Sequence, residues 1–220
     1  MKSPIFTSNA HKTIEEGILL ALNKEKDFLS AKTAGSTRAA GDAIQSIIED
    51  KFEQILGKHG GEYSAGFARR AMADLAFKDT QGNYYVVDVK THREETSFNM
   101  PNLISVDRLA RFYEDDANFF VMLMVKYSVT GTKVIVRKVH FVPIEYLDWS
   151  CLTLGALGAG QIQIANSKHI VIESKRTRRS WMLDLCENVL QFYPREIAKL
   201  NKRIGKFEKI KAYWLAKKNS

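Results

Sequence analysis

The chain has 220 residues, of which 45% are hydrophobic and 26% are charged, and its formal net charge is +8. We expect one globular domain over residues 1–220, because this length and apolar content suit a single sizeable core. Two distant cysteines, Cys151 and Cys186, exclude a disulfide framework and a cysteine-based zinc site. The longest early apolar run, Ile18–Leu22, is too short for a signal-peptide core or a membrane span, so we expect a cytoplasmic protein without a membrane partner.

The first clear element is a helix over Gly41–Leu56. Its apolar residues recur every three or four positions, which is the spacing of one buried helix face. They are Ile44, Ile47, Ile48, Phe52, Ile55 and Leu56. The run from Lys58 to Gly61, with its two glycines, is typical of a helix end.

A β-hairpin is predicted next. Two short segments, Met72–Phe77 and Tyr84–Lys90, are rich in apolar, aromatic and β-branched residues. Between them lies Asp79–Asn83, whose Asp, Gly and Asn residues are typical of a tight turn.

Four more strands are expected farther along the chain. They are Phe119–Tyr127, Lys133–Val142, Gln161–Ala165 and His169–Glu173. Helical spacing returns from Trp181. An order of helices, strands and helices predicts an α/β or α+β fold, with a central, mostly antiparallel mixed sheet flanked by helices.

The carboxyl-terminal segment, residues 195–218, is expected to be a basic helix. Apolar residues spaced three or four apart along Ile197–Trp214 form a stripe with basic residues beside it. From Arg195 to the end, nine basic and two acidic residues give a net charge of +7. Such an excess attracts nucleic acid or an acidic membrane surface, and the alternative is a solvated helix face. The stripe could serve a dimer interface, the lysines could serve DNA, or the helix could do both.

Asp74, Asp88 and Lys90 are the candidate catalytic residues. Side chains alternate along a strand, so Asp88 and Lys90 project from one face, and the hairpin can bring Asp74 beside them. Charged groups on an apolar strand are costly unless they pair, bind a metal or face water. Two carboxylates can hold Mg²⁺, which polarises a scissile phosphate, and the lysine can orient the attacking water. The alternative for an Asp-x-Lys triplet alone is a surface ion pair.

These residues resemble a known signature. The sequence pattern Ala73-Asp74 … Asp88-Val89-Lys90 is similar to the motif of the PD-(D/E)xK nucleases, with Ala73 where proline is more common. Within that superfamily, the type II restriction endonucleases of the EcoRV and HincII kind are the most similar group. The segments that resemble them are Ala40–Asp42, Asp88–Thr91, Pro101–Ser105, Gln161–Gln163 and Arg176–Trp181.

The resemblance implies a restriction-endonuclease-like core and a homodimer that clasps double-stranded DNA. It also implies Mg²⁺-dependent hydrolysis of both strands at a palindromic site, with blunt ends by analogy. Asp74 and Asp88 would be the metal ligands, and Lys90 would position water or balance charge. In similar enzymes a glutamate on the first helix lies near the metal. Here the matching position holds Gln45, with Glu49 one turn later, and either residue could assist.

The segment His92–Asn102 is polar and directly follows the catalytic strand, so we expect it beside bound DNA. Amide side chains can form paired hydrogen bonds with adenine, which makes candidates of Asn99, Asn102, Gln161 and Gln163. Met100 would contact the bases or wedge between them. Arg178, in the basic cluster Lys175–Arg179, would bind phosphates. The alternative for each residue is ordinary loop or strand-edge polarity.

Three functions remain open from the sequence. The first is a type II restriction endonuclease, and the second is a structure-specific repair or recombination nuclease built on the same core. The third is a non-catalytic DNA-binding module that uses the basic carboxyl-terminal helix. Asp74, Asp88 and Lys90 argue against the third, because a binding module does not need two carboxylates near phosphate.

Overall fold

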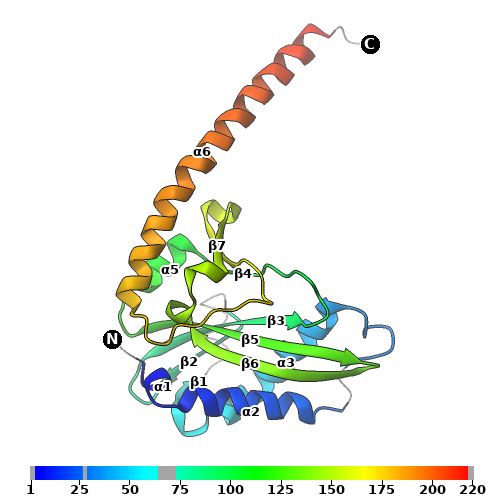
Figure 1. The fold of residues 1–220 in the computed structure, drawn as a ribbon, viewed down its shortest axis with the longest axis vertical. Coiled ribbons are helices and arrows are strands. Elements are labelled where there is room, and N and C mark those ends of the chain that lie inside the picture. The colour runs from blue at the N-terminus through cyan, green and yellow to red at the C-terminus, as the bar shows by residue number, and fades with distance from the viewer. Residues whose placement is uncertain (1–2, 27–28, 64–72, 218–220) are drawn as a thin grey trace.

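The structure is a computed structural model that describes residues 3–26, 29–63 and 73–217. A twisted five-stranded sheet forms its centre, helices cover one face, and a small second sheet lies over the other (Figure 1). From this body a single long helix projects far outward and carries the carboxyl terminus (Figure 1). The architecture confirms the predicted α/β class with a mixed sheet flanked by helices.

The central sheet has the strand order β1-β2-β3-β5-β6. Its members are β1 (Gly60–Tyr63), β2 (Leu75–Asp79), β3 (Tyr84–Arg93), β5 (Asn118–Thr130) and β6 (Lys133–Pro143). Only the β3–β5 pair in this sheet is parallel, and the other three pairs are antiparallel. The predicted hairpin is therefore confirmed as β2 and β3, although Met72 lies outside the described residues.

Three helices cover one face of this sheet: α1 (Pro4–Thr7), α2 (Ala10–Lys24) and α3 (Thr37–Leu56). The α3 helix begins where the Ser36 hydroxyl accepts a hydrogen bond from the Ala39 N–H, 3.2 Å away. It ends at Gly57, whose φ of +48° suits a residue without a Cβ. Four residues of the predicted apolar face, Ile44, Ile48, Phe52 and Leu56, are almost fully buried against the sheet.

A second apolar core lies on the opposite face of the sheet. It is covered by α5 (Val106–Phe112), by the start of α6 (Arg178–Ala216) and by a second sheet of order β4-β8-β7. These strands are β4 (Asn102–Ser105), β7 (Leu152–Gly155) and β8 (Gln161–Ile164). Short 3-10 turns span Gly57–His59, Ile144–Tyr146, Trp149–Cys151 and Leu157–Ala159.

One expectation about the last third of the chain differs from the structure. His169–Glu173 is not a strand, and its only ladder contact is an isolated bridge between Leu147 and Ile172. The α6 helix continues through Pro194, although proline removes a backbone donor and favours a helix end. Among the described helices, none is long and apolar enough to cross a membrane.

Candidate active site

Asp88 and Lys90 project from the face of β3 that also carries Val86, toward the second core. The alternate residues Val87 and Val89 pack into the core on the other face, as strand geometry requires. Lys90 Nζ donates a hydrogen bond to Asp88 Oδ1 over 2.7 Å, and the two side chains are only 21% and 15% exposed. Asp88 and Lys90 therefore form a largely buried ion pair and not an exposed one.

Asp74 joins this pair from the residue directly before β2. The register places Leu75 opposite Val87, so Asp74 lies across from Asp88. Its Oδ2 accepts a hydrogen bond from the Val89 N–H at 2.6 Å. The two acids and the lysine that the sequence predicted are thus brought together by β2 and β3.

Gln45 is the residue of α3 that contacts Asp74. Its Nε2 donates to Asp74 Oδ1 at 3.0 Å and to Glu49 Oε1 at 2.9 Å. Gln45 is half-buried, whereas Glu49 is exposed and reaches Asp74 only through this amide. The side-chain amide of Gln45 is therefore the group from α3 that holds Asp74 in place.

Burial dominates the electrostatics of Asp88. It raises the pKa of this carboxyl group to about 7, Lys90 opposes the shift, and the nearby negative charge of Asp74 adds to it. Asp88 Oδ2 is buried and has no hydrogen-bond partner among the described residues. A buried carboxylate oxygen without a partner is costly, and a bound cation would offset that cost.

The donor set around Asp74 and Asp88 consists of oxygen atoms, which suits a hard cation. No group of three or more His, Cys, Asp or Glu residues that could hold a metal ion occurs in the described part of the chain. Mg²⁺ does not require such a group, because it usually keeps several waters and binds one or two carboxylates together with substrate phosphates. Two carboxylates, one with a buried unpartnered oxygen, therefore fit Mg²⁺.

A cleft of about 470 Å³ opens beside the site. Its walls are the amino-terminal half of α3, the end of β3 and residues 93–101, and they include Gln45, Lys90 and Asn99. Arg38 and Arg93 also line it, and each belongs to an ion pair, Arg38 with Asp42 of the same cleft and Arg93 with Glu95. The predicted DNA-reading segment after β3 does lie beside the candidate catalytic lysine.

Three of the four amides proposed for base reading, Asn99, Asn102 and Gln163, form hydrogen bonds within the protein. Asn99 Nδ2 donates to the Thr91 carbonyl at 3.1 Å. Gln163 Nε2 donates to Asn102 Oδ1 at 2.5 Å across the β4–β8 pair, and Gln163 is 9% exposed. Gln161 is half-buried on the same strand, and Met100 is 42% exposed. The structure thus brings these residues together around β4 and β8, with Met100 and Asn102 exposed.

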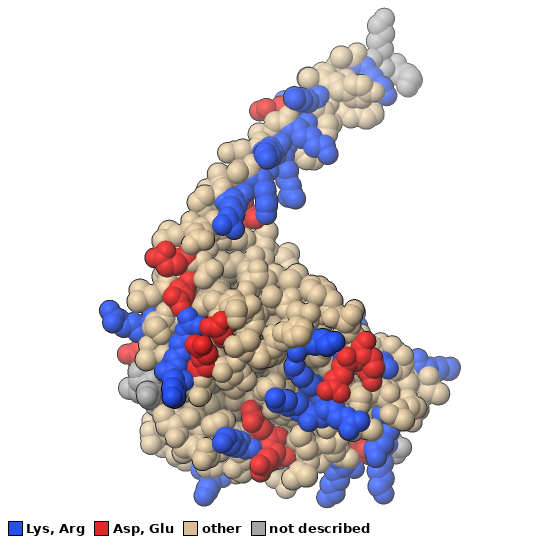
Figure 2. Space-filling view, in the orientation of Figure 1, with Lys and Arg blue, Asp and Glu red and all other residues tan. Residues whose placement is uncertain are grey.

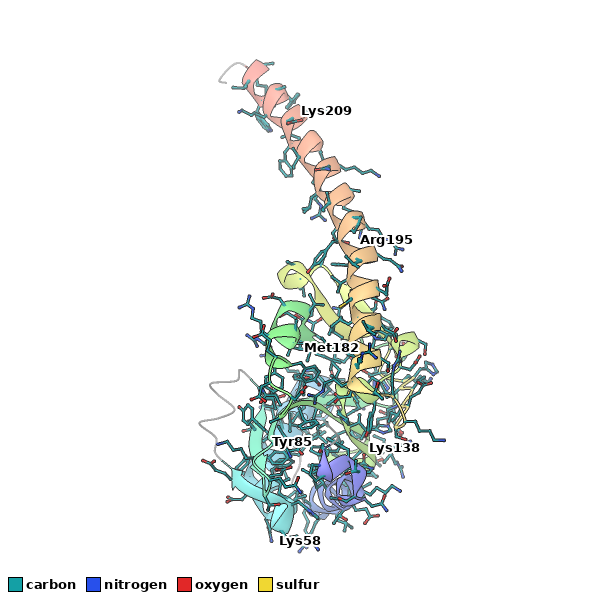
Figure 3. The ribbon with its side chains drawn as sticks, turned by 90° about the vertical axis from the view of Figure 1, so that its left-hand side faces the viewer. Lys58, Tyr85, Lys138, Met182, Arg195 and Lys209 are labelled. Carbon is teal, nitrogen blue, oxygen red and sulfur yellow. The ribbon has the colours of Figure 1, made fainter. Side chains whose placement is uncertain are left out.

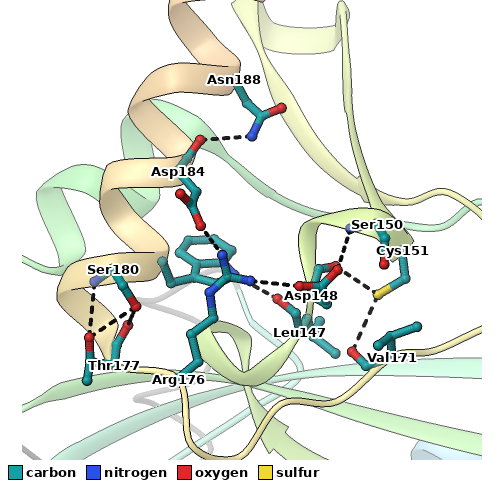
Figure 4. Close-up of polar contacts among 11 residues, drawn as sticks. Leu147, Asp148, Ser150, Cys151, Val171, Arg176, Thr177, Ser180, Asp184 and Asn188 are labelled. Carbon is teal, nitrogen blue, oxygen red and sulfur yellow. Dashed lines mark hydrogen bonds and ion pairs between the residues drawn. The ribbon is translucent and has the colours of Figure 1, made fainter.

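The structure gives Arg178 an internal role. Its side chain is 11% exposed and forms an ion pair with Glu145, 3.2 Å away, and its guanidinium lies over the rings of Tyr113 and Phe119. In the same basic cluster, Arg176 bridges Asp148 and Asp184 at the base of α6 (Figure 4). The exposed members of the cluster are Lys175 and Arg179. Phosphate contacts by the cluster would therefore involve these two residues first.

A row of basic side chains on the sheet face of Lys90 was not predicted. His92 is paired in register with Lys126, and Lys126 with Lys138, so the three share one face. His140 lies on the same face of β6, and burial, with Lys138 and Lys126 beside it, lowers its pKa to about 4. Figure 3 labels Lys138, the member of this row that lies on β6 opposite Lys126. No local sequence signal reveals this row, because it depends on the parallel pairing of β3 with β5.

Comparison with protein-family models finds no match for this chain, and comparison with curated proteins finds no significant relative.

Proposed function

We propose that this protein is a Mg²⁺-dependent DNA endonuclease whose active site is formed by Asp74, Asp88 and Lys90. The observation that supports this most directly is the buried, unpartnered Asp88 Oδ2. It belongs to a carboxylate that lies beside a second acid and is paired with a lysine on the same strand face. An ordinary structural ion pair between Asp88 and Lys90 does not need Asp74, whose negative charge raises the pKa of Asp88.

Each residue then has a distinct role. Asp74 and Asp88 would hold the metal, and Gln45 and the Val89 N–H keep the Asp74 carboxylate oriented. When bound, Mg²⁺ would polarise the scissile phosphate and lower the pKa of a bound water. Asp88 binds a cation only as a carboxylate, so its proton first leaves to solvent. Lys90 lines the cleft, where its remaining N–H groups can stabilise charge on phosphate oxygens and orient the attacking water.

Double-stranded DNA is the proposed substrate. Lys126 and Lys138 on the sheet face of Lys90 support a polyanion there. Arg38 and Arg93 in the cleft could add to this by leaving Asp42 and Glu95 for phosphate. The finer proposal is a homodimeric type II restriction endonuclease that cuts both strands of a palindromic site and leaves blunt ends. That step is supported by the sequence resemblance and by the cluster of amides around β4 and β8.

The test is digestion of plasmid DNA by the purified protein with Mg²⁺ and with a chelator, followed by sequencing of the ends. Discrete fragments that require Mg²⁺ are expected, and the ends report the site and the stagger. Cleavage of junctions or flaps without sequence preference would favour a repair or recombination nuclease instead. DNA binding without cleavage under any of these conditions would favour a binding module.

Variants of the site make the test specific. Asp88→Ala and Lys90→Ala are each expected to lower the cleavage rate by about a thousandfold or more while DNA binding persists. Asp50→Ala and Lys58→Ala are matched controls, because both side chains are exposed and lie outside the site. Unchanged cleavage in both site variants would refute the assignment of these residues.

A further inference from the structure

The long helix α6 is firmly attached to the body only at its base. Trp181 is completely buried, stacks on Trp149 with ring centroids 5.1 Å apart, and donates from Nε1 to the Leu147 carbonyl. Arg176 adds ion pairs to Asp148 and Asp184 (Figure 4). Beyond Tyr193, the last residue of α6 packed against the second core, the helix leaves the body (Figures 1 and 3). At a rise of 1.5 Å per residue, residues 194–216 extend about 35 Å.

This projecting part carries an unpartnered apolar stripe. Six large apolar side chains fall on a seven-residue repeat and are more than half exposed: Leu190, Ile197, Leu200, Ile204, Phe207 and Trp214. The half-buried Tyr193 lies on the same repeat where the helix leaves the body. In heptad letters, the a positions are Leu190, Ile197, Ile204 and Lys211, and the d positions are Tyr193, Leu200, Phe207 and Trp214. A strict a/d stripe is narrower than the apolar face of an ordinary amphipathic helix and is the seam of a coiled coil.

The surface of the helix is hollowed along this seam. A shallow groove is lined by two a residues, two d residues, and one residue from each flanking position. They are Ile204 and Lys211 at a, Leu200 and Phe207 at d, Glu208 at e and Arg203 at g. Holes of this kind receive the knobs of a partner helix in coiled-coil packing.

The charges on α6 are arranged around the seam. Five basic residues occupy the c and f positions, on the face opposite the stripe: Arg195, Lys199, Lys202, Lys206 and Lys209. Figure 2 shows Lys and Arg side chains gathered along one flank of the projecting helix, and Figure 3 labels Arg195 and Lys209 on it. Lys211 is therefore the one basic residue at an a or d position along Leu190–Trp214.

We propose that α6 pairs with α6 of a second copy of this chain in a parallel two-stranded coiled coil. The parallel arrangement places g residue Arg203 of one copy beside e residue Glu208 of the other, twice by symmetry, so opposite charges meet at both edges. β-Branched Ile197 and Ile204 at a, with Leu200 at d, suit two parallel strands, and one lysine at an a position, Lys211, fixes the register. Ile210 at g and Leu215 at e would meet in the same way and extend the apolar contact.

In this assembly both bodies lie at the same end of the coil, and the basic c and f faces point outward. The inference names the surface and the arrangement that would form the homodimer proposed above, and it depends on α6 alone, so it holds whether or not the body cleaves DNA. A single active site cuts one strand at a time, so pairing would also supply the second site that double-strand cleavage requires.

The first test is sedimentation equilibrium of the full chain without DNA or metal, over about a hundredfold range of concentration. A dimer with twice the 25.0 kDa mass of one chain is expected. Ile204→Asp buries a charge in the seam and should weaken dimerisation by about a hundredfold or more. Lys206→Asp is the control, because it adds the same side chain two residues away on the outer face. A chain that stays monomeric throughout, or a dimer that Ile204→Asp leaves intact, would overturn the proposal.

The second test concerns orientation. Arg203→Glu and Glu208→Arg each place like charges across both edges and should weaken the dimer by about tenfold. An equimolar mixture of the two variants should form a heterodimer of nearly native strength, because both edge pairs are then opposite in sign. An antiparallel pair does not bring these two positions together, so the absence of recovery in the mixture would refute the parallel arrangement. Monomeric chain that binds phosphatidylcholine–phosphatidylserine vesicles, and loses that binding in Ile204→Asp, would assign the stripe to lipid instead.

Discussion

The carboxylate of Asp74 accepts a hydrogen bond from the backbone N–H of Val89, with 2.6 Å between Oδ2 and N. Val89 lies between Asp88 and Lys90 in β3, so this bond fixes the first acid of the candidate site against the backbone that carries the other two groups. A neutral residue of the same shape can keep the bond but cannot supply a negative charge. The structural and chemical roles of Asp74 can therefore be separated by experiment.

Asp74→Asn is expected to fold normally and to lose activity. The asparagine carbonyl oxygen can still accept from Val89, and Gln45 can turn its amide so that its oxygen accepts from the new NH₂ group, at the cost of its bond to Glu49. The free energy of unfolding should therefore fall by only about 1 kcal/mol. Mg²⁺ affinity, measured by calorimetry, should fall by about tenfold, and the cleavage rate by about a hundredfold or more, because one anionic ligand is lost. A variant with native Mg²⁺ affinity and native cleavage would show that Asp74 is purely structural.

Asp88→Asn should stabilise the metal-free protein at alkaline pH. The folded pKa of Asp88 is about 7, above the ordinary value of 3.8, so the folded state holds its proton more tightly than the unfolded state. Ionisation of Asp88 therefore costs stability as pH rises from about 4 to 7, and the whole cost is present above pH 7. The substitution removes that cost, which about three pKa units place at up to about 4 kcal/mol, or about 10 °C in the melting temperature.

Thermal unfolding with a chelator at pH 8 and at pH 4 measures this effect. The variant should melt above the wild type at pH 8 and close to it at pH 4, where the wild-type carboxyl group is already neutral. Asp50→Asn is the control, since Asp50 is exposed. An equal gain at both pH values would point to packing rather than to the charge of Asp88.

Gln45→Glu should lower the stability of the metal-free protein and raise its affinity for Mg²⁺. A carboxylate at this position faces Asp74 and Glu49 without the two hydrogen bonds that the amide donates, so we expect a loss of about 1 kcal/mol in the metal-free protein. It also adds a third acid beside the site, which should raise Mg²⁺ affinity by about tenfold. Gln54→Glu, on the exposed side of the same helix, is the control. Calorimetric titration that shows equal affinity in both variants would exclude Gln45 from the metal environment.

The parts of the fold and site that could be predicted depend on short stretches of sequence. The α3 helix follows from the spacing of Ile44, Ile48 and Phe52, and the β2–β3 hairpin follows from two apolar runs around a turn. The shared face of Asp88 and Lys90 needs only the alternation of a strand. These are local properties, and the structure confirms them.

The parts that could not be predicted depend on packing between distant segments. Which of Gln45 and Glu49 reaches Asp74 is set by the rotation of α3 on the sheet. The neighbours of Lys90 are set by the parallel β3–β5 pair, whose partners lie more than 30 residues apart. Arg178 was predicted to bind phosphate because it lies in a basic cluster. Its actual partner, Glu145, lies 33 residues earlier, where the local sequence does not reveal it. The His169–Glu173 prediction was wrong because the segment beside it, around Leu147, follows a 3-10 turn and is not a strand, so only one bridge forms.

His140 should make the protein sensitive to acid. Burial and the charges of Lys138 and Lys126 lower its folded pKa to about 4, below the ordinary value of 6.5, so the unfolded state binds a proton first as pH falls. The stability from the neutral ring is fully present above pH 6.5 and is lost as pH falls toward 4, by up to about 3 kcal/mol. His140→Gln should flatten this part of the stability–pH curve, measured by urea unfolding. The exposed His169→Gln should leave it unchanged, and a curve that stays equally steep in His140→Gln would exclude this residue as the cause.

Arg178→Met should destabilise the protein without abolishing DNA binding. Tyr113 donates to Glu145 Oε2 at 2.7 Å, Arg178 pairs with Oε1, and the Glu145 side chain is only 6% exposed. Removing the guanidinium leaves a buried carboxylate without its counter-ion, which we expect to cost about 3 kcal/mol and to lower the melting temperature by about 10 °C. Glu145→Gln in the same chain should restore much of this loss, because the uncompensated charge is then gone.

The neighbouring Arg179→Met supplies the contrast, since Arg179 is exposed. It should leave the melting temperature nearly unchanged and weaken DNA binding by about twofold to threefold at low salt, as expected for the loss of one phosphate contact. DNA binding by Arg178→Met, measured well below its melting temperature, should stay within about twofold of the wild type. A fully folded Arg178→Met that loses most of its DNA affinity would instead make Arg178 a phosphate ligand that leaves Glu145 when DNA binds.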